Sequence, residues 1–366
     1  MRVGGVPEAL VAPAATDALV EAAREVWASG EEWLLLGGGS NTVASDDGFE
    51  GTVIHVVTRG VDRIDAPDGR VRLRVQAGEP WDDVVALTVR NGWSGVEALS
   101  GIPGSTGAAP VQNIGAYGQE LESALVAIDF LDAVTGDVVR LSRAELELGY
   151  RTSVLKRGRL GVVLAVELEL SDNSVPGGVG VPLSGPVAYT QLADSLGVPL
   201  GSRVPVAELR RAVLALRASK GMVLDPDDPD SVSSGSFFTN PIVSEPFARG
   251  LPANAPRGPV TPPEPDVVIG LPLGGVHPLD IPPLAGGPYD VKLSAAWVIE
   301  NAGIRRGFAL PGLGAAISSK HTLAIVNRGH ATAADVAQLA SFIQARVQAE
   351  FGVLLRPEPV LVGLTL

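Results

Sequence analysis

The sequence has no cysteine and only four histidines in 366 residues. The lack of cysteine excludes disulfides, thiolate metal sites, iron–sulfur clusters and a cysteine nucleophile. The histidines are His55, His277, His321 and His330, and no two of them have the spacing of metal ligands. We therefore expect no metal site and no catalysis by cysteine.

The sequence also has fewer basic than acidic residues: 28 lysines and arginines against 41 aspartates and glutamates, which gives a net charge of −13. An acidic surface opposes nonspecific nucleic-acid binding, so we expect no nucleic-acid partner. An anionic ligand would need isolated lysines and arginines inside its site. The residues Met1–Gly5 do not begin a signal peptide, and no apolar run reaches about 18 residues, so we expect a cytoplasmic protein with no membrane partner.

The chain is long enough for two or three domains, and its hydrophobic content of 46% suffices for packed cores. Hydrophobic periodicity predicts helices at 15–29, 81–91, 206–219, 294–302 and 333–351. It predicts strands at 33–36, 53–57, 71–75, 126–131, 162–170 and 323–326. Irregular segments are expected at 42–46, 172–186, 225–234 and 244–288. This mixture indicates an α+β fold.

A buried strand at Leu34–Leu36 runs directly into Gly37-Gly38-Gly39-Ser40-Asn41. Three glycines allow the backbone to approach a ligand closely, and successive amide N–H groups can then face phosphate oxygens. Ser40 and Asn41 add side-chain donors. The glycines equally suit an ordinary turn. The motif differs from the Gly-x-Gly-x-x-Gly dinucleotide fingerprint, because a loop and not a helix is expected after it.

The segment Gly101–Gly118 consists almost entirely of small residues, and most of its polar residues are neutral donors. This composition suits a backbone that wraps closely around a long, partly apolar cofactor. The alternative is a structural Ω-loop. Because two segments of this kind occur in one chain, we favour a cofactor site formed by both.

Three isolated polar residues are candidates for chemistry. Arg151 stands among small polar residues and suits either a bidentate clamp on a carboxylate or an exposed surface position. Ser236 precedes Phe237-Phe238 and should lie at the mouth of an apolar pocket, where proton donation fits better than acyl transfer because no histidine is nearby. A turn or N-cap serine fits Ser236 equally well. Glu358 lies in a proline-flanked segment, where a solvated carboxylate is the ordinary alternative.

Taken in order, the motifs resemble the UDP-N-acetylenolpyruvoylglucosamine reductase family over nearly the whole chain. The matching segments are Gly37–Asn41, Gly101–Gly118, Tyr150–Ser153, Gly235–Pro241, Lys292–Trp297 and Pro357-Glu358. The resemblance implies a two-part FAD-binding domain of the vanillyl-alcohol oxidase type, at 1–57 and 58–217. It also implies a C-terminal α/β substrate-binding domain at 218–350, with 351–366 packing back on the second part.

The same resemblance implies noncovalent FAD, NADPH as the reductant, and reduction of UDP-N-acetylglucosamine-enolpyruvate to UDP-N-acetylmuramate in peptidoglycan synthesis. Its catalytic residues fall on Arg151, Ser236 and Glu358. Arg151 and Glu358 would stabilise an enolate-like intermediate, and Ser236 would protonate the neighbouring carbon. Glu358 could help only if protonated or strongly hydrogen-bonded, which implies a raised pKa. We expect a monomer.

The resemblance also assigns contacts to the two ligands. The expected FAD contacts are Gly37, Gly38, Gly39, Ser40, Asn41, Pro103, Gly104, Ser105, Thr106, Gly107, Pro110, Asn113, Gly115, Tyr117 and Val163. The expected substrate contacts are Tyr189, Lys220, Asn240 and Lys292, with Tyr189 in the tyrosine loop of the longer subfamily. The aromatic contact to the uridine diphosphate has one candidate, Tyr289. Pro359 departs from the family, which more often has a branched aliphatic residue there.

Two other functions fit parts of the sequence. A hydroxy-acid oxidase or dehydrogenase on the same FAD domain would often carry a histidine or cysteine for covalent attachment, and neither glycine-rich segment contains one. A non-enzymatic nucleotide-binding or scaffold protein would leave the three catalytic positions free to vary, whereas all three match the family pattern.

Overall fold

The computed structural model describes residues 1–173, 180–260 and 290–366. Its first unit is a parallel sheet in the order β1-β4-β2, formed by β1 (Pro7–Val11), β2 (Trp33–Leu36) and β4 (Phe49–His55). Helix α1 (Thr16–Ser29) connects β1 to β2, as parallel strands require a crossover. The helix ends at Gly30, whose φ of 73° suits glycine. The predicted helix at 15–29 and strand at 33–36 are confirmed.

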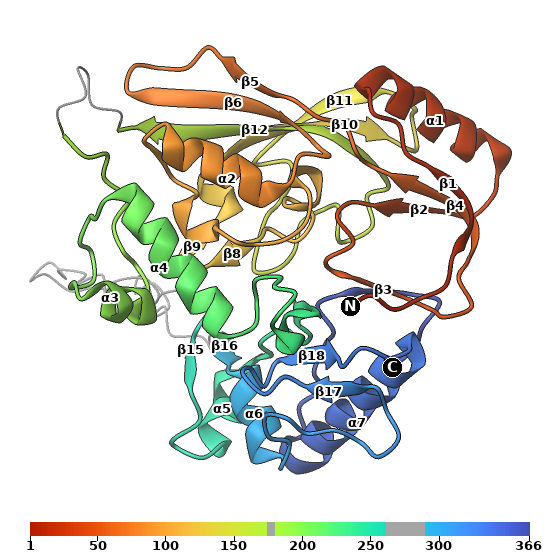
Figure 1. Ribbon diagram of the computed structural model, residues 1–366, viewed down its shortest axis with the longest axis vertical. Helices are drawn as coiled ribbons and strands as arrows, with labels where there is room; N and C mark the ends of the chain where they lie inside the picture. The colour runs from red at the N-terminus through yellow and green to blue at the C-terminus, as the bar shows by residue number, and fades with distance from the viewer. Residues whose placement is uncertain (174–179, 261–289) are drawn as a thin grey trace, which may run out of the picture.

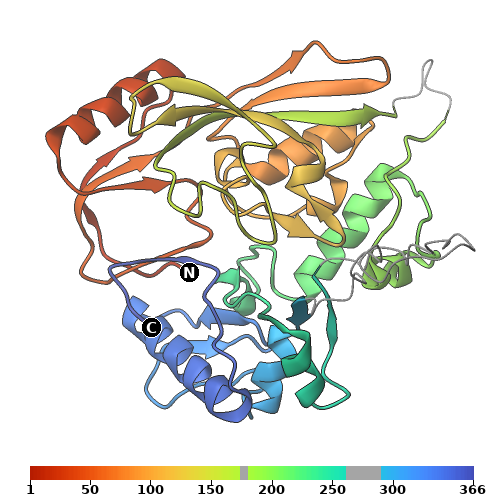
Figure 2. The same ribbon diagram turned by 180° about the vertical axis from the view of Figure 1, so that it is seen from behind.

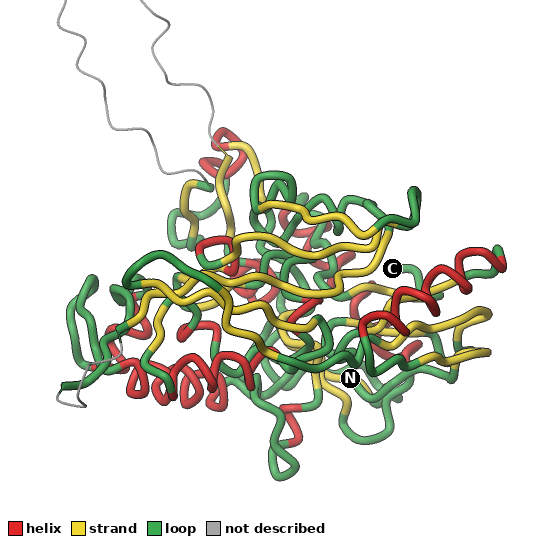
Figure 3. The backbone as a smooth tube through the Cα atoms, turned by 90° about the horizontal axis from the view of Figure 1, so that it is seen from above, coloured by secondary structure: helices red, strands yellow, loops and turns green. Residues whose placement is uncertain are grey.

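The second unit is a larger antiparallel sheet in the order β11-β10-β12-β6-β5, with β7 paired to β12 (Figure 1). Its strands are β5 (Val61–Ile64), β6 (Arg70–Gln76), β7 (Trp93–Ser94), β10 (Leu125–Asp132), β11 (Val138–Ser142) and β12 (Gly161–Asp172). Strand β6 alternates as predicted, because Val71, Leu73 and Val75 are buried. Figure 3, seen from above, shows these strands running side by side.

Helix α2 (Trp81–Arg90) adds Trp81, Val84 and Val85 to the core of this sheet. The same core takes Leu19 and Ile54 from the first unit, so the two sheets share their buried side chains. Helices α3 (Thr190–Leu196) and α4 (Val206–Ser219) form a small separate cluster below α2, with the hairpin β8 (Gly115–Ala116) and β9 (Gln119–Glu120) nearby (Figure 1).

The C-terminal half contains two small antiparallel sheets. One has the order β13-β18-β17, with β13 (Ser233–Ser236), β17 (Ala315–Ile317) and β18 (Ala324–Asn327). The other has the order β14-β16-β15, with β14 (Ile242–Ser244), β15 (Arg257–Pro259) and β16 (Asp290–Leu293). Figure 2 shows α6 (Ala295–Asn301) and α7 (Ala333–Phe351) beside them. A capping box of Thr332 and Asp335 begins α7.

Three predicted loops contain regular structure, and the physical reason is the same in each. Residues 42–44 form β3 (Thr42–Ala44), which pairs in parallel with β19 (Val360–Val362). The loop at 225–234 includes the start of β13, and the irregular stretch from 244 includes α5 (Glu245–Gly250) and β15. These elements are too short to show a hydrophobic periodicity in the sequence. They form because they pack against partners elsewhere in the chain.

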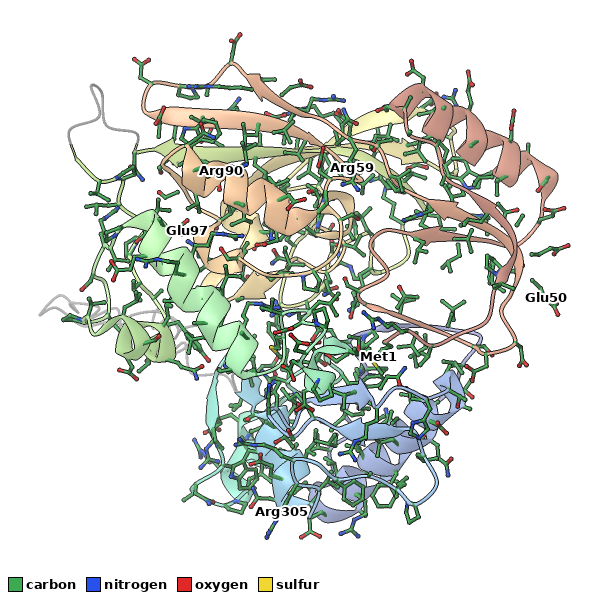
Figure 4. All side chains as sticks on the ribbon, viewed as in Figure 1. Met1, Glu50, Arg59, Arg90, Glu97 and Arg305 are labelled. Carbon is green, nitrogen blue, oxygen red and sulfur yellow. The ribbon has the colours of Figure 1, made fainter. Side chains whose placement is uncertain are left out.

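The β3–β19 pair brings the end of the chain to the first glycine-rich segment. The Val360 amide donates to the Asn41 carbonyl at 2.9 Å, and the Ser45 amide donates to Val362 at 2.8 Å. Residues 351–366 contact both parts of the predicted FAD-binding domain. Strand β19 pairs with β3, which lies in 1–57, and Glu358 accepts a hydrogen bond from Gln112, which lies in 58–217. Figure 4 labels Met1 near the middle of the molecule, and its carbonyl accepts a hydrogen bond from Asn327 in β18 at 3.0 Å.

Candidate active site

A cavity of about 2210 Å³ lies where the glycine-rich segments meet the C-terminal half. Sites for one small ligand usually measure about 300–1,000 Å³, so this cavity has room for a long cofactor and a substrate together. All of the predicted site residues line it except Thr106, Pro110 and Asn113. The structure therefore brings together residues that the sequence separates by more than three hundred positions.

The two glycine-rich segments pack directly against each other. A methyl group added at Gly38 would lie 2.8 Å from the Cα of Gly104, and one at Gly37 would lie 2.5 Å from Ser105 Oγ. One added at Gly104 would lie 2.8 Å from Ser40 Oγ. A side chain at Gly38 would force the segments apart, because it would meet backbone, whereas the serine hydroxyls near Gly37 and Gly104 could turn away. The absence of a side chain at Gly38 thus allows a single continuous wall.

That wall presents unpaired amide groups. Among the residues that the structure describes, the backbone N–H groups of Gly38, Gly39, Ser40 and Ser105 donate no hydrogen bond. Clusters of free backbone N–H groups in a turn form anion-binding concavities. This donor set fits the diphosphate of FAD, and it lies on the wall of a cavity long enough for the rest of that cofactor.

Thr106, Pro110 and Asn113 lie buried behind the wall and support it. The Thr106 hydroxyl donates to the Glu79 carbonyl at 3.0 Å. Asn113 Nδ2 donates to the Gly149 carbonyl at 3.2 Å. These bonds tie the segment Gly101–Gly118 to its neighbours and hold its shape.

Arg151 is held in a specific conformation beside the wall. Its φ of 54° is left-handed, which costs an arginine on the order of 1 kcal/mol. Its guanidinium donates to the Gly115 carbonyl at 2.7 Å and to the Asn113 carbonyl at 3.4 Å. Its Nε lies 3.6 Å from Glu358 Oε1, with 20% of the arginine side chain and 17% of the glutamate side chain exposed. The two side chains therefore form an ion pair that is partly shielded from water.

Burial raises the pKa of Glu358. The charges of Arg151 and Lys156 and a hydrogen bond from Gln112 lower this pKa, without cancelling the effect of burial. Gln112 Nε2 donates to Glu358 Oε1 at 3.3 Å. The direction of the shift agrees with the requirement for a protonated carboxyl.

Ser236 belongs to the C-terminal half of the chain and lines the same cavity. It is the last residue of β13, follows Gly235 with a φ of 77°, and lines the cavity. Phe237 and Phe238 are 0% and 1% exposed in the C-terminal core, so Ser236 lies at the edge of an apolar region as predicted. The Phe237 carbonyl accepts a hydrogen bond from the Glu358 amide at 2.8 Å, which places the backbone next to Ser236 beside the backbone of Glu358.

Lys220 marks one cationic end of the cavity. Its Nζ donates to Gln191 Oε1 at 2.8 Å and lies 5.6 Å from the centre of the Tyr117 ring. Tyr117 in turn contacts Tyr189 edge to face, with ring centres 5.6 Å apart. Burial and then the charge of Arg217 lower the pKa of Lys220.

A second cationic group lies around Tyr150. Lys292 Nζ is 4.6 Å from the centre of this ring, and the Arg151 guanidinium carbon is 5.4 Å from it. Asn240 lines the cavity, and its Oδ1 accepts a hydrogen bond from the Ala295 amide at 2.9 Å, at the start of α6. Tyr289, the candidate for the uridine contact, lies outside the described residues.

Sequence reasoning missed several residues of the cavity. Gln112 is inside a segment that the sequence singles out, yet nothing distinguished its amide from that of Asn113. Lys156 follows the Tyr150–Ser153 motif by three positions, so the search for isolated basic residues could have found it. Arg217, on α4, lines the cavity and its buried Nε has no hydrogen-bond partner among the described residues.

Two family models match the chain. A model described as an FAD binding domain matches residues 7–142, which include both glycine-rich segments. A model described as the C-terminal domain of UDP-N-acetylenolpyruvoylglucosamine reductase matches residues 227–362, which include Ser236, Lys292 and Glu358. The fold and the site thus define an FAD-binding protein with the C-terminal domain of a reductase, and the expected fold class is confirmed.

Curated relatives named UDP-N-acetylenolpyruvoylglucosamine reductase align over the whole chain. That of Leifsonia xyli is 76% identical over 100% of this chain and 97% of its own length. Those of Saccharopolyspora erythraea and Mycolicibacterium smegmatis are 48% and 40% identical, each over 100% of this chain and 93% of their own length. The chain belongs to the UDP-N-acetylenolpyruvoylglucosamine reductase family.

A solved structure shares the fold. It is the crystal structure of the reductase from Thermus caldophilus, which matches with a TM-score of 0.56 and 24% identity over 96% of this chain and 91% of that chain. In the part of this chain that the structure describes, no helix is both long and apolar enough to cross a membrane.

Proposed function

We propose that this protein reduces UDP-N-acetylglucosamine-enolpyruvate to UDP-N-acetylmuramate, with noncovalent FAD as cofactor and NADPH as reductant. Membership of the family supports the reaction. The observation that carries the proposal is the partly buried Arg151–Glu358 pair, 3.6 Å apart, in the same cavity as two glycine-rich segments with free amide groups. The relatives named as this reductase favour the reaction over that of a hydroxy-acid oxidase.

The chain's own residues supply binding, orientation and charge. FAD, when bound, supplies the hydride-transfer chemistry. The free amides of Gly38, Gly39 and Ser40 would hold its diphosphate, and Gly104 keeps the opposing backbone close. Lys220 and Lys292 would hold the substrate diphosphate from the two cationic groups.

Arg151 and Glu358 would act where negative charge develops. Hydride addition to the terminal carbon of the enolpyruvyl group makes an enolate-like species beside the substrate carboxylate. Arg151 contributes a fixed positive charge, and Glu358 contributes a hydrogen bond if its carboxyl is protonated. Ser236 would then donate its hydroxyl proton to the adjacent carbon. Water must stay out of this region, which the low exposure of both charged side chains favours.

We also propose the finer organisation that the sequence suggested. The FAD-binding parts would be 1–57 and 58–217, and the substrate-binding domain would be 218–350. The separate C-terminal core, which runs from Phe237 to Leu355 and also includes Met1 and Val43, supports the last of these. The protein would act as a cytoplasmic monomer in peptidoglycan precursor synthesis.

The test is turnover with the nucleotide. Purified protein should consume NADPH beyond one equivalent per flavin only when UDP-N-acetylglucosamine-enolpyruvate is present, and mass spectrometry should show a product that has gained one hydride and one proton. A chain that consumes NADPH at the same rate without the nucleotide, or that leaves the nucleotide unchanged, would not have this function.

A further inference from the structure

Three hydrogen bonds fix the orientation of the Gln112 amide. Asn41 Nδ2 donates to the Glu358 backbone carbonyl at 3.3 Å and to Gln112 Oε1 at 3.0 Å. A backbone carbonyl can only accept, so the nitrogen of Asn41 must face it. The oxygen of Gln112 must then face Asn41, which turns its NH₂ group toward Glu358, where it lies 3.3 Å from Oε1. The chemistry of the groups therefore sets the orientation.

The positive charge of Arg151 lies beside the same carboxyl oxygen. Arg151 Nε lies 3.6 Å from Glu358 Oε1. Among the residues that the structure describes, none is hydrogen-bonded to Oε2. A proton is disfavoured on an oxygen that accepts a hydrogen bond from one N–H group and lies beside a cation. A proton on this carboxyl is therefore directed to Oε2.

We propose that Gln112 is a positioning residue for the reaction: oriented by Asn41, it keeps Glu358 Oε1 as an acceptor and so makes Oε2 the O–H donor toward the substrate. This inference rests on the proposed function. Asn41 would then have two roles. It belongs to the proposed cofactor segment Gly37–Asn41, and through Gln112 it also orients the Glu358 carboxyl. Loss of the Gln112 donor would leave the carboxyl free to rotate and to place its proton on either oxygen.

The charged groups that bear on Glu358 are Arg151 and Lys156, both from the segment 150–156. Both favour the ionised carboxylate, as does the hydrogen bond from Gln112, whereas burial favours the protonated form. Removal of the Gln112 donor should therefore raise the pKa of Glu358. If protonated Glu358 is the active form, the rate of substrate reduction falls as the pH rises through this pKa, and the fall moves to higher pH in the variant.

Gln112→Met tests this in the FAD-loaded protein with the two half-reactions measured separately. Reduction of the flavin by NADPH should stay close to the wild-type rate. Reoxidation by the enolpyruvyl nucleotide should slow by about tenfold, the upper end for loss of one hydrogen bond between neutral groups. The fall of its rate with rising pH should move to higher pH. Gln348→Met is the matched control, because Gln348 is exposed on α7.

Gln112→Glu is the second variant, because it keeps an oxygen for Asn41 and nearly the same shape. When protonated, the introduced carboxyl can donate to Glu358 Oε1, so the reoxidation rate should recover toward wild type at low pH and collapse as the new carboxyl ionises. The positioning role is overturned if Gln112→Met keeps the wild-type pH profile, or if both half-reactions slow equally. If the wild-type reduced flavin itself does not react with the nucleotide, it is the proposed function that fails.

Discussion

Gly38 and Gly104 lie so close that the two glycine-rich segments form one wall: a Cβ on Gly38 would sit 2.8 Å from the Gly104 Cα. Real Cβ atoms do not approach a backbone carbon so closely, and neither segment can yield without moving the amides beside it. The position of the free N–H groups thus depends on the absence of a side chain at residue 38.

Gly38→Ala should therefore lose flavin. Overpacking of this kind costs about 1–3 kcal/mol, and it displaces the donors of the proposed diphosphate site. The ratio of flavin absorbance to protein absorbance after gel filtration measures the effect. Gly250→Ala is the control, because a Cβ at Gly250 meets nothing within 4 Å and that residue ends α5. Equal flavin content in the two variants would contradict the account of the wall.

Ser236→Ala should separate the two half-reactions. The variant lacks the proposed proton donor but keeps the backbone of β13 and the Phe237 carbonyl that holds Glu358. Flavin reduction by NADPH should continue, and reoxidation by the nucleotide should fall by about 10²–10⁴-fold, the usual contribution of a general acid. Stopped-flow absorbance measures both rates. If both half-reactions survive unchanged, Ser236 is not the donor.

The sequence predicted the chemical groups of this site better than their surroundings. Arg151, Ser236 and Glu358 were named from motifs, and they line one cavity. The role of Gln112 and the β3–β19 pair were not predicted. Gln112 contacts Glu358 near the end of the chain, and β19, also near that end, pairs with β3 within the first fifty residues. Periodicity reports only neighbours within a few residues, so contacts of this range leave no local signal.

Glu358→Gln should stabilise the protein increasingly as the pH rises. Because burial raises the folded-state pKa of Glu358 above its unfolded value, its protonated form favours folding below the unfolded pKa. That contribution is lost as the pH rises through the folded pKa. Glutamine resembles the neutral acid at every pH, so the variant should match wild type at low pH and exceed it at higher pH. Urea unfolding at several pH values measures this, and a pH-independent difference would contradict it.

His321 should affect the pH dependence of stability in the direction opposite to Glu358. Burial, followed by the charges of Lys220 and Arg306, lowers the pKa of His321 from 6.5 to about 4. A depressed histidine contributes stability above its unfolded pKa, and this stability is lost as the pH falls toward the folded value. His321→Gln should therefore reduce the loss of stability between about pH 6.5 and 4. Thermal unfolding across that range checks it, and identical slopes for variant and wild type would refute the assignment.

One series of spectral changes in the wild-type protein tests the proposed function most directly. Under anaerobic conditions NADPH should bleach the flavin band, and UDP-N-acetylglucosamine-enolpyruvate should then restore it with formation of UDP-N-acetylmuramate. A protein without a flavin band, or a reduced flavin that the nucleotide leaves bleached, would contradict the proposed function.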